Sequence, residues 1–172
     1  MGARTYRSSR AQQVGLSWIE FSVLCAMFAV FGGSLLTALF YYEELAEAAV
    51  VQLTVQNMRS GLRYQIADRL VRGRTSEMAQ LLDENPVMWL ERPPEGYAGS
   101  IRTTDIRNVR PGSWFYDVDM NEVGSVPRHS AYLNLDAGGA PTLRWRTRGI
   151  RLRPQDEVEG LALISLTPYR WF

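Results

Sequence analysis

Residues 15–20 read Gly-Leu-Ser-Trp-Ile-Glu, and residues 21–42 then read FSVLCAMFAVFGGSLLTALFYY, which is 22 positions without a charged side chain. A helix of that length measures about 33 Å at 1.5 Å per residue, enough to cross a hydrocarbon core of about 30 Å. Core helices of water-soluble domains rarely run so far without a charge. We therefore interpret residues 16–42 as a membrane-spanning helix.

The charges that flank this helix orient it. Residues 1–15 contain Arg4, Arg7 and Arg10 and no acid, a local charge of +3, whereas Glu43 and Glu44 follow the apolar run directly. By the positive-inside rule the N-terminus is cytoplasmic and the bulk of the chain lies across the membrane. An ordinary secretory signal is disfavoured, because its apolar core is shorter and ends in small residues at a cleavage site.

Glu20 does not fit a plain membrane anchor. It lies one residue before the apolar run, and residues 16–19 are already largely apolar, so we expect the helix to begin near Leu16. A carboxylate at membrane depth costs about 2.5–3.5 kcal/mol on insertion scales, so it normally has a partner. A free α-amino group at a helix start, made by a cut just upstream, would suit it.

The basic leader, the hexapeptide at 15–20 and the adjoining apolar helix together resemble the type III signal of type IV prepilins and type II secretion pseudopilins. The resemblance covers residues 1 to about 45 and implies that a prepilin peptidase removes residues 1–15. It implies a cut between Gly15 and Leu16 and N-methylation of Leu16. Glu20 would pair with the N-terminal amine of a neighbouring subunit.

The same resemblance implies a place and partners for the protein. It predicts a single-pass protein of the bacterial inner membrane with a periplasmic head, which then enters a pilus or pseudopilus filament. The implied partners are the prepilin peptidase, other pilin or pseudopilin subunits, an inner-membrane assembly platform and, before assembly, membrane lipid. No cofactor is implied.

Composition excludes several chemistries. All 19 basic residues are Arg, so a P-loop Lys and a pyridoxal-phosphate Lys are both missing. One Cys (Cys25) and one His (His129) cannot form a zinc site of four Cys/His ligands or an internal disulfide. Since major type IVa pilins usually close a C-terminal loop with a disulfide, its absence favours a minor pilin or a pseudopilin.

The helical pattern continues through residues 43–72 as an amphipathic half that packs on a globular head. An apolar stripe with a spacing near four residues predicts the packed face: Leu45, Ala49, Leu53, Met58, Leu62, Ile66 and Leu70. The stripe is too short and its heptads too imperfect for a coiled coil. Gly73 is the predicted stop. Gly32 and Gly33 allow either local unwinding or close helix packing, and both readings stay open.

Residues 73–172 form the predicted head, an antiparallel sheet of three to five strands packed on the long helix. We expect a capped helix at 75–82, strands at 114–118 and 123–126 joined by a turn, a strand at 143–148, a β-bulge at Gly149 and a final strand at 161–166. The predicted fold is therefore α+β and pilin-like. Residues 85–90, 111–117 and 168–172 also resemble, more weakly, pseudopilins of mannose-sensitive haemagglutinin type pili.

Two clusters in the head have a functional and a plain interpretation. Asp117, Asp119 and Asn121 have the spacing of a calcium loop, but Glu122 replaces the required Gly and residue 128 is not Glu, so we favour a solvated turn and predict no metal site. Five arginines in ten residues suggest contact with a polyanion such as DNA. These are Arg144, Arg146, Arg148, Arg151 and Arg153.

We favour for these arginines a solvated strand face, or salt bridges to Glu43, Glu44 or the acids of residues 156–159, and nucleic acid is the less favoured partner. We interpret His129 as a histidine of a surface loop, because no nucleophile motif surrounds it and nothing in the sequence places an acid beside it. Trp171 and Phe172 either pack on the head or meet a partner.

The sequence thus predicts a non-enzymatic filament subunit. The first alternative is an uncleaved, membrane-anchored periplasmic binding module that uses residues 144–153 as its ligand surface. The second is a membrane-bound hydrolase, which the scarcity of His and Cys disfavours.

Overall fold

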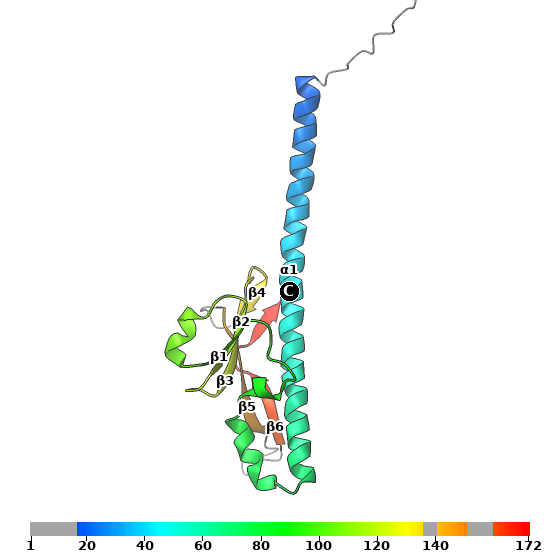
Figure 1. The fold of residues 1–172 in the computed structure, drawn as a ribbon. Coiled ribbons are helices and arrows are strands. Elements are labelled where there is room, and N and C mark those ends of the chain that lie inside the picture. The colour runs from blue at the N-terminus through cyan, green and yellow to red at the C-terminus, as the bar shows by residue number, and fades with distance from the viewer. Residues whose placement is uncertain (1–16, 136–140, 151–159) are drawn as a thin grey trace, which may run out of the picture. The chain divides into compact units, whose positions relative to one another are not determined.

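The computed structural model describes residues 17–135, 141–150 and 160–172. The chain divides into two compact units, residues 1–40 and residues 41–172. A long N-terminal helix and a small, mostly antiparallel sheet give the predicted α+β class (Figure 1). The helices are α1 (Trp18–Val71) and the 3₁₀ helices η1 (Thr75–Leu82), η2 (Pro86–Trp89) and η3 (Thr103–Asn108). The strands are β1 (Tyr97–Ile101), β2 (Ser113–Asp117), β3 (Glu122–Val126), β4 (Leu133–Leu135), β5 (Leu143–Ile150), β6 (Gly160–Ser165) and β7 (Tyr169–Trp171).

Helix α1 ends as the sequence predicts. Gly73 adopts φ +67°, a conformation that residues with a Cβ rarely take. Its N–H donates to the carbonyl of Leu70 at 3.1 Å, and the N–H of Arg74 donates to the carbonyl of Arg69 at 2.8 Å. These two bonds make a Schellman motif, which satisfies carbonyls that the end of a helix would otherwise leave unpaired.

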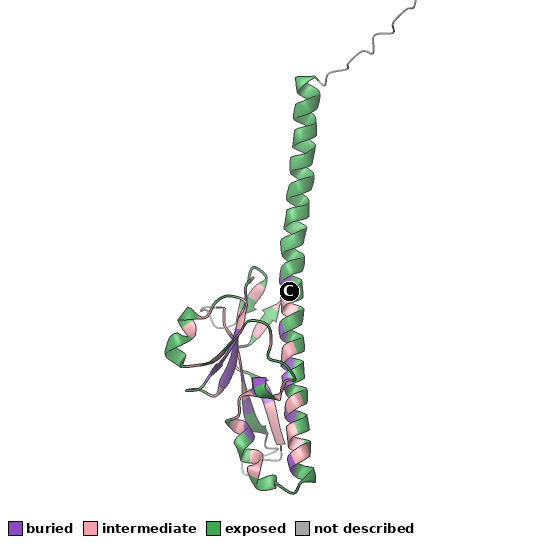
Figure 2. Ribbon diagram, in the orientation of Figure 1, coloured by how far each residue is buried: buried purple, intermediate pink, exposed green. Residues whose placement is uncertain are grey.

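The buried face of α1 differs from the predicted stripe. Val51, Val55, Met58 and Leu62 are buried, at separations of four, three and four residues (Figure 2). Leu45, Leu53 and Leu70 are 40–58% exposed, so that part of the prediction is wrong. Residues spaced strictly four apart are about 400° apart around the helix axis, so each lies about 40° further around the helix than the one before. Residues whose spacing alternates between four and three stay on one face.

The main sheet has the strand order β1-β2-β3-β5-β6. The pairings β2–β3, β3–β5 and β5–β6 are antiparallel, and they confirm the predicted hairpin and the strands that follow it. Strand β1 was not predicted and pairs with β2 in parallel. Strands β4 and β7, also not predicted, form a separate two-stranded antiparallel sheet, so β6 is not the final strand.

Two local predictions in the head are wrong. Strand β5 pairs with β6 in unbroken register from Trp145↔Ser165 to Ile150↔Gly160, so Gly149 makes no bulge and Ile150 lies exposed. The helix at 75–82 forms, but as a 3₁₀ helix, and the residue that precedes it, Arg74, makes no side-chain capping bond.

The core lies between α1 and one face of the main sheet. Trp114 stacks on Trp145 with ring centroids 5.6 Å apart, and Met58, Leu62 and Leu163 pack around the same cluster. Each such side chain contributes about 1.5–3 kcal/mol by leaving water. The alternation predicted for residues 143–148 is confirmed, because Leu143 and Trp145 enter this core while the intervening arginines are more exposed.

Candidate functional site

The first part of α1 presents only exposed side chains. Every residue from Ser17 to Glu43 is exposed in the isolated chain, including the large apolar ones. These are Trp18, Ile19, Phe21, Val23, Leu24, Met27, Phe28, Val30, Phe31, Leu35, Leu36, Leu39, Phe40, Tyr41 and Tyr42. By length and composition this one helix can span a membrane. A surface of this size and apolarity requires a non-aqueous partner, either lipid or other helices.

The hydroxyl groups inside this apolar segment are satisfied by the helix itself. Ser34 Oγ donates to the carbonyl of Val30 and Thr37 Oγ1 to that of Gly33, each at 2.9 Å. Such bonds let a helix enter lipid without unpaired hydroxyls. The helix is continuous through Gly32 and Gly33, and a Cβ at either would meet no atom within 4 Å. Local unwinding is therefore not observed in the isolated chain.

The helix begins with a reciprocal cap. The N–H of Ser17 donates to Glu20 Oε2 at 2.8 Å, and the N–H of Glu20 donates to Ser17 Oγ at 3.2 Å. This pattern is a capping box, which satisfies two N–H groups that the first turn would leave unpaired. The cap sets the helix start at Trp18, two residues later than expected.

The capping box also gives Glu20 a partner within its own chain. The Ser-x-x-Glu spacing at residues 17–20 was available in the sequence as a signal for this arrangement. The predicted cleavage and methylation positions, Gly15 and Leu16, lie outside the described residues, as do Arg151 and Arg153.

In the head unit, two carboxylates of α1 hold the loop that precedes β4. Glu44 is 2% exposed and accepts hydrogen bonds from the N–H groups of Ala131 and Tyr132 and from Trp171 Nε1, at 2.8–3.2 Å. A buried carboxylate with three donors is stabilised where an unpaired one would be costly. Trp171 therefore packs on the head, and Glu44 ties both chain segments to the helix.

Glu47 holds the same loop one turn further along α1. It accepts hydrogen bonds from the N–H groups of Arg128 and His129, at 2.6 and 3.0 Å. His129 Nδ1 lies 3.2 Å from Glu47 Oε2, and its Nε2 lies 3.9 Å from Glu43 Oε2. Folding places acids beside His129 that the sequence did not indicate, because it brings together residues more than 80 positions apart. Within the part of the chain that the structure describes, no Ser, Thr or Cys side chain hydrogen-bonds to the His129 ring.

The arginines of β5 have acidic partners. Arg144 and Arg146 bind the two carboxylate oxygens of Glu122 at 3.0 and 2.5 Å, and Arg144 also lies 3.7 Å from Asp117. Both acids are buried, with Glu122 4% exposed. The partners of Arg144 and Arg146 are thus strand neighbours rather than Glu43 or Glu44, and the acids of residues 156–159 lie outside the described residues. Arg148 is exposed.

The turn between β2 and β3 is built around Asp117. Its carboxylate accepts from Thr103 Oγ1 at 2.8–2.9 Å and from the N–H of Asp119 at 3.1 Å, so it is occupied by the protein's own donors. Among the residues that the structure describes, no group of His, Cys, Asp or Glu could hold a metal ion. Tyr116, on the neighbouring position, donates to the carbonyl of Asp83 at 3.0 Å.

Two tyrosines of the head have perturbed ionisation. Burial raises the pKa of Tyr116 above 10.0, and the nearby carboxylate of Asp83 raises it further. Burial also raises the pKa of Tyr169, against a smaller opposing effect of Arg59. Both phenol groups stay protonated at neutral pH. Tyr116 acts as a hydrogen-bonding core residue, and Tyr169 packs against the core.

Comparisons of this chain with protein-family models, with curated proteins and with solved structures found no match.

Proposed function

We propose that this chain is a structural subunit, a minor pilin or a pseudopilin, of a type IV pilus or a type II secretion pseudopilus. It enters the inner membrane with its N-terminus in the cytoplasm and its head in the periplasm. A prepilin peptidase cuts after Gly15 and methylates Leu16. The subunit then leaves the lipid, engages the assembly platform and joins other subunits through its apolar helix.

One observation carries the proposal. Helix α1 is continuous from Trp18 to Val71, yet its first part is exposed and apolar throughout while its second part supplies Val51, Val55, Met58 and Leu62 to the core of a small α+β head. A lipid anchor needs only the first part. One helix that contains both an exposed apolar segment and part of the head core is the arrangement that a filament subunit needs, and this supports the proposal.

The proposal gives Glu20 a second partner. In the isolated chain its Oε2 accepts from the Ser17 N–H. Glu20 is exposed, so a neighbour's amine can approach the carboxylate without breaking the cap. A charge-assisted bond of this kind is about twice as strong as a neutral one and would offset the cost of a carboxylate in lipid.

Mass spectrometry of the purified protein tests the proposal. Expressed with an active prepilin peptidase, the chain should lose residues 1–15 and gain one methyl group on Leu16; expressed without the enzyme, it should keep its leader. Gly15→Val should block the cut because a branched side chain replaces the smallest residue at the cleaved bond. Gly2→Val, in the same leader, should be processed normally. An intact leader beside an active peptidase would refute the proposal.

The alternative, an uncleaved periplasmic binding module, predicts an intact leader in the same experiment. Its ligand surface would lie on β5, where Arg144 and Arg146 are already engaged by Glu122. Displacing a buried carboxylate partner opposes ligand binding. The ion pairs therefore favour the filament subunit.

A further inference from the structure

An aromatic cluster in the head unit begins with the last two residues of the apolar run. Tyr41 and Tyr42 come from α1, Tyr132 from the loop before β4, and Phe172 from the residue after β7. The ring centroids of Tyr41, Tyr132 and Phe172 lie 5.2–5.5 Å from one another, and Tyr42 lies 5.5 Å from Tyr41. Three segments that are distant in sequence thus meet in one group of rings.

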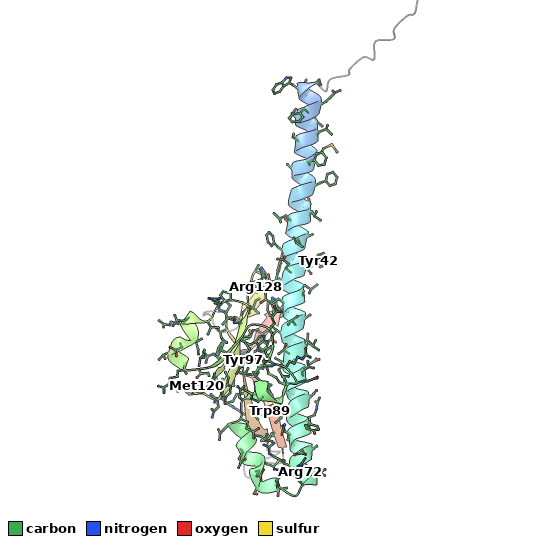
Figure 3. All side chains as sticks on the ribbon, viewed as in Figure 1. Tyr42, Arg72, Trp89, Tyr97, Met120 and Arg128 are labelled. Carbon is green, nitrogen blue, oxygen red and sulfur yellow. The ribbon has the colours of Figure 1, made fainter. Side chains whose placement is uncertain are left out.

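These rings are in contact and yet remain accessible. Tyr41, Tyr42, Tyr132 and Phe172 are 38–64% exposed, whereas Trp114 and Trp145, which stack in the head core, are at most 4% exposed. A cluster that served only as core would bury its rings. Figure 3 labels Tyr42 on the stretch of α1 where the cluster begins.

The cluster is held in place by hydrogen bonds. Glu44 accepts from the N–H of Tyr132 at 2.8 Å and from Trp171 Nε1 at 2.9 Å, and the N–H of Phe172 donates to the carbonyl of Tyr132 at 3.3 Å. Glu44 is therefore a positioning residue for Tyr132 and Phe172. Its own charge is enclosed by these donors, because Glu44 is only 2% exposed.

The position of Tyr41 and Tyr42 along the helix and the chemistry of their side chains together indicate what the aromatic cluster contacts. Tyr41 and Tyr42 are the last two of the 22 uncharged residues, so they fall at the boundary of the hydrocarbon layer that the run can span. Tyrosine is enriched at that boundary because its ring is apolar and its hydroxyl is polar. Exposed charges follow at once, with Glu43 on α1 and Arg128 in the loop.

We infer that Tyr41, Tyr42, Tyr132 and Phe172 form a membrane-interface surface by which the head rests on the lipid headgroup layer before the subunit is assembled. This inference rests on the membrane insertion contained in the proposed function. The loop and the β7 segment contribute rings that no single-helix anchor would have, so the head itself contacts lipid.

Site-specific fluorine NMR of the full chain in phosphatidylethanolamine and phosphatidylglycerol vesicles tests the inference. Trifluoromethyl-phenylalanine replaces, one at a time, Tyr132, Phe172, Tyr64 and Phe28. Each sample is measured with a lipid that carries a nitroxide close to its headgroup and, separately, with a water-soluble gadolinium chelate. Tyr64 is the matched control, because it is a tyrosine of α1 that is 69% exposed and lies 22 residues beyond Tyr42.

The inference predicts that the lipid nitroxide broadens the signals at positions 132 and 172 several-fold more than the signal at 64. Broadening of the signals at 132 and 172 by the aqueous chelate alone would overturn the inference. Broadening by neither reagent would also overturn it, since another protein surface would then cover the rings. The signal at Phe28 separates the two proposals. If the lipid nitroxide broadens the signal at position 28 but not the signals at 132 or 172, membrane insertion stands and the interface surface is refuted. If it does not broaden the signal at position 28, both membrane insertion and the interface surface are refuted.

Discussion

At the scale of single residues, α1 uses its carboxylates to bind backbone N–H groups. Glu20 accepts from Ser17, Glu44 from Ala131 and Tyr132, and Glu47 from Arg128 and His129. A carboxylate that accepts backbone N–H groups satisfies donors that a loop or helix end leaves unpaired. These acids therefore organise the chain around the helix.

The buried member of this group should be the most sensitive. Glu44→Gln replaces one acceptor oxygen by an NH₂ group that faces N–H donors, and leaving a buried donor unpaired costs about 1–3 kcal/mol. We expect the free energy of unfolding of the full chain in detergent to fall by about that amount, as measured by urea titration of tryptophan fluorescence. Glu43→Gln, at the neighbouring and exposed position, should change it by less than about 0.5 kcal/mol. Equal losses would contradict the role given to Glu44.

Tyr116 predicts a pH dependence at alkaline pH. Its pKa is raised above 10.0 in the folded chain by burial and by Asp83, so the folded state retains a proton that the unfolded state loses. Its contribution to stability is complete below pH 10 and declines as the pH rises through the folded pKa. The chain has no Lys, so no lysine titrates in the same window.

Measurement of the unfolding free energy from pH 9 to pH 11 would check this. Tyr116→Phe should make the decline shallower, with the remainder coming from Tyr169, whose pKa is also raised. It should also lower stability at neutral pH, because the bond to the Asp83 carbonyl is lost. A variant with the same alkaline slope as the natural chain would show that Tyr116 does not cause the decline.

At the scale of elements, the approach of α1 to η2 depends on a glycine. A Cβ built on Gly61 would lie 2.7 Å from both Cβ and the carbonyl oxygen of Trp89, which belong to the most rigid part of that residue. Contacts this short force a shift of the helix or of η2. Gly61 thus sets how closely the two elements pack.

Gly61→Ala should destabilise the head although alanine is the better helix former. The gain in helix propensity is about 1 kcal/mol, whereas overpacking typically costs about 1–3 kcal/mol. We expect a net loss in the urea unfolding free energy of the full chain. Gly33→Ala is the matched control on the same helix, because its Cβ meets nothing within 4 Å. An unchanged or raised stability of Gly61→Ala would refute the close contact.

Predictability from sequence differs between elements for physical reasons. The apolar run, the stop at Gly73 and the alternation in β5 were predicted, because each depends on residues close together in sequence. Strand β1 was missed because a parallel pairing with β2 has no hairpin signal. The buried face of α1 was partly misjudged, because Leu45 and Leu53 are as apolar as Val51 and only the head decides which are covered.

The candidate site divides in the same way. Glu20 was found from its neighbours in sequence, and its cap with Ser17 could have been found from the same four residues. Sequence neighbours could not have indicated that His129 pairs with Glu47 or that Arg144 pairs with Glu122, because 82 and 22 positions separate these partners. Contacts across such distances follow from topology, which periodicity alone does not determine.

At the scale of the whole molecule, the bonds to Glu44 constrain the order in which the chain can fold. Its donors lie 87, 88 and 127 residues later in the sequence. At about 5–20 residues per second, a ribosome needs roughly 6–25 s to make the longest of these intervals. The helix is therefore complete while its buried carboxylate and the face beneath the head are still uncovered. Chaperone protection would be most needed in this interval, and the last of the three donors to be made is Trp171.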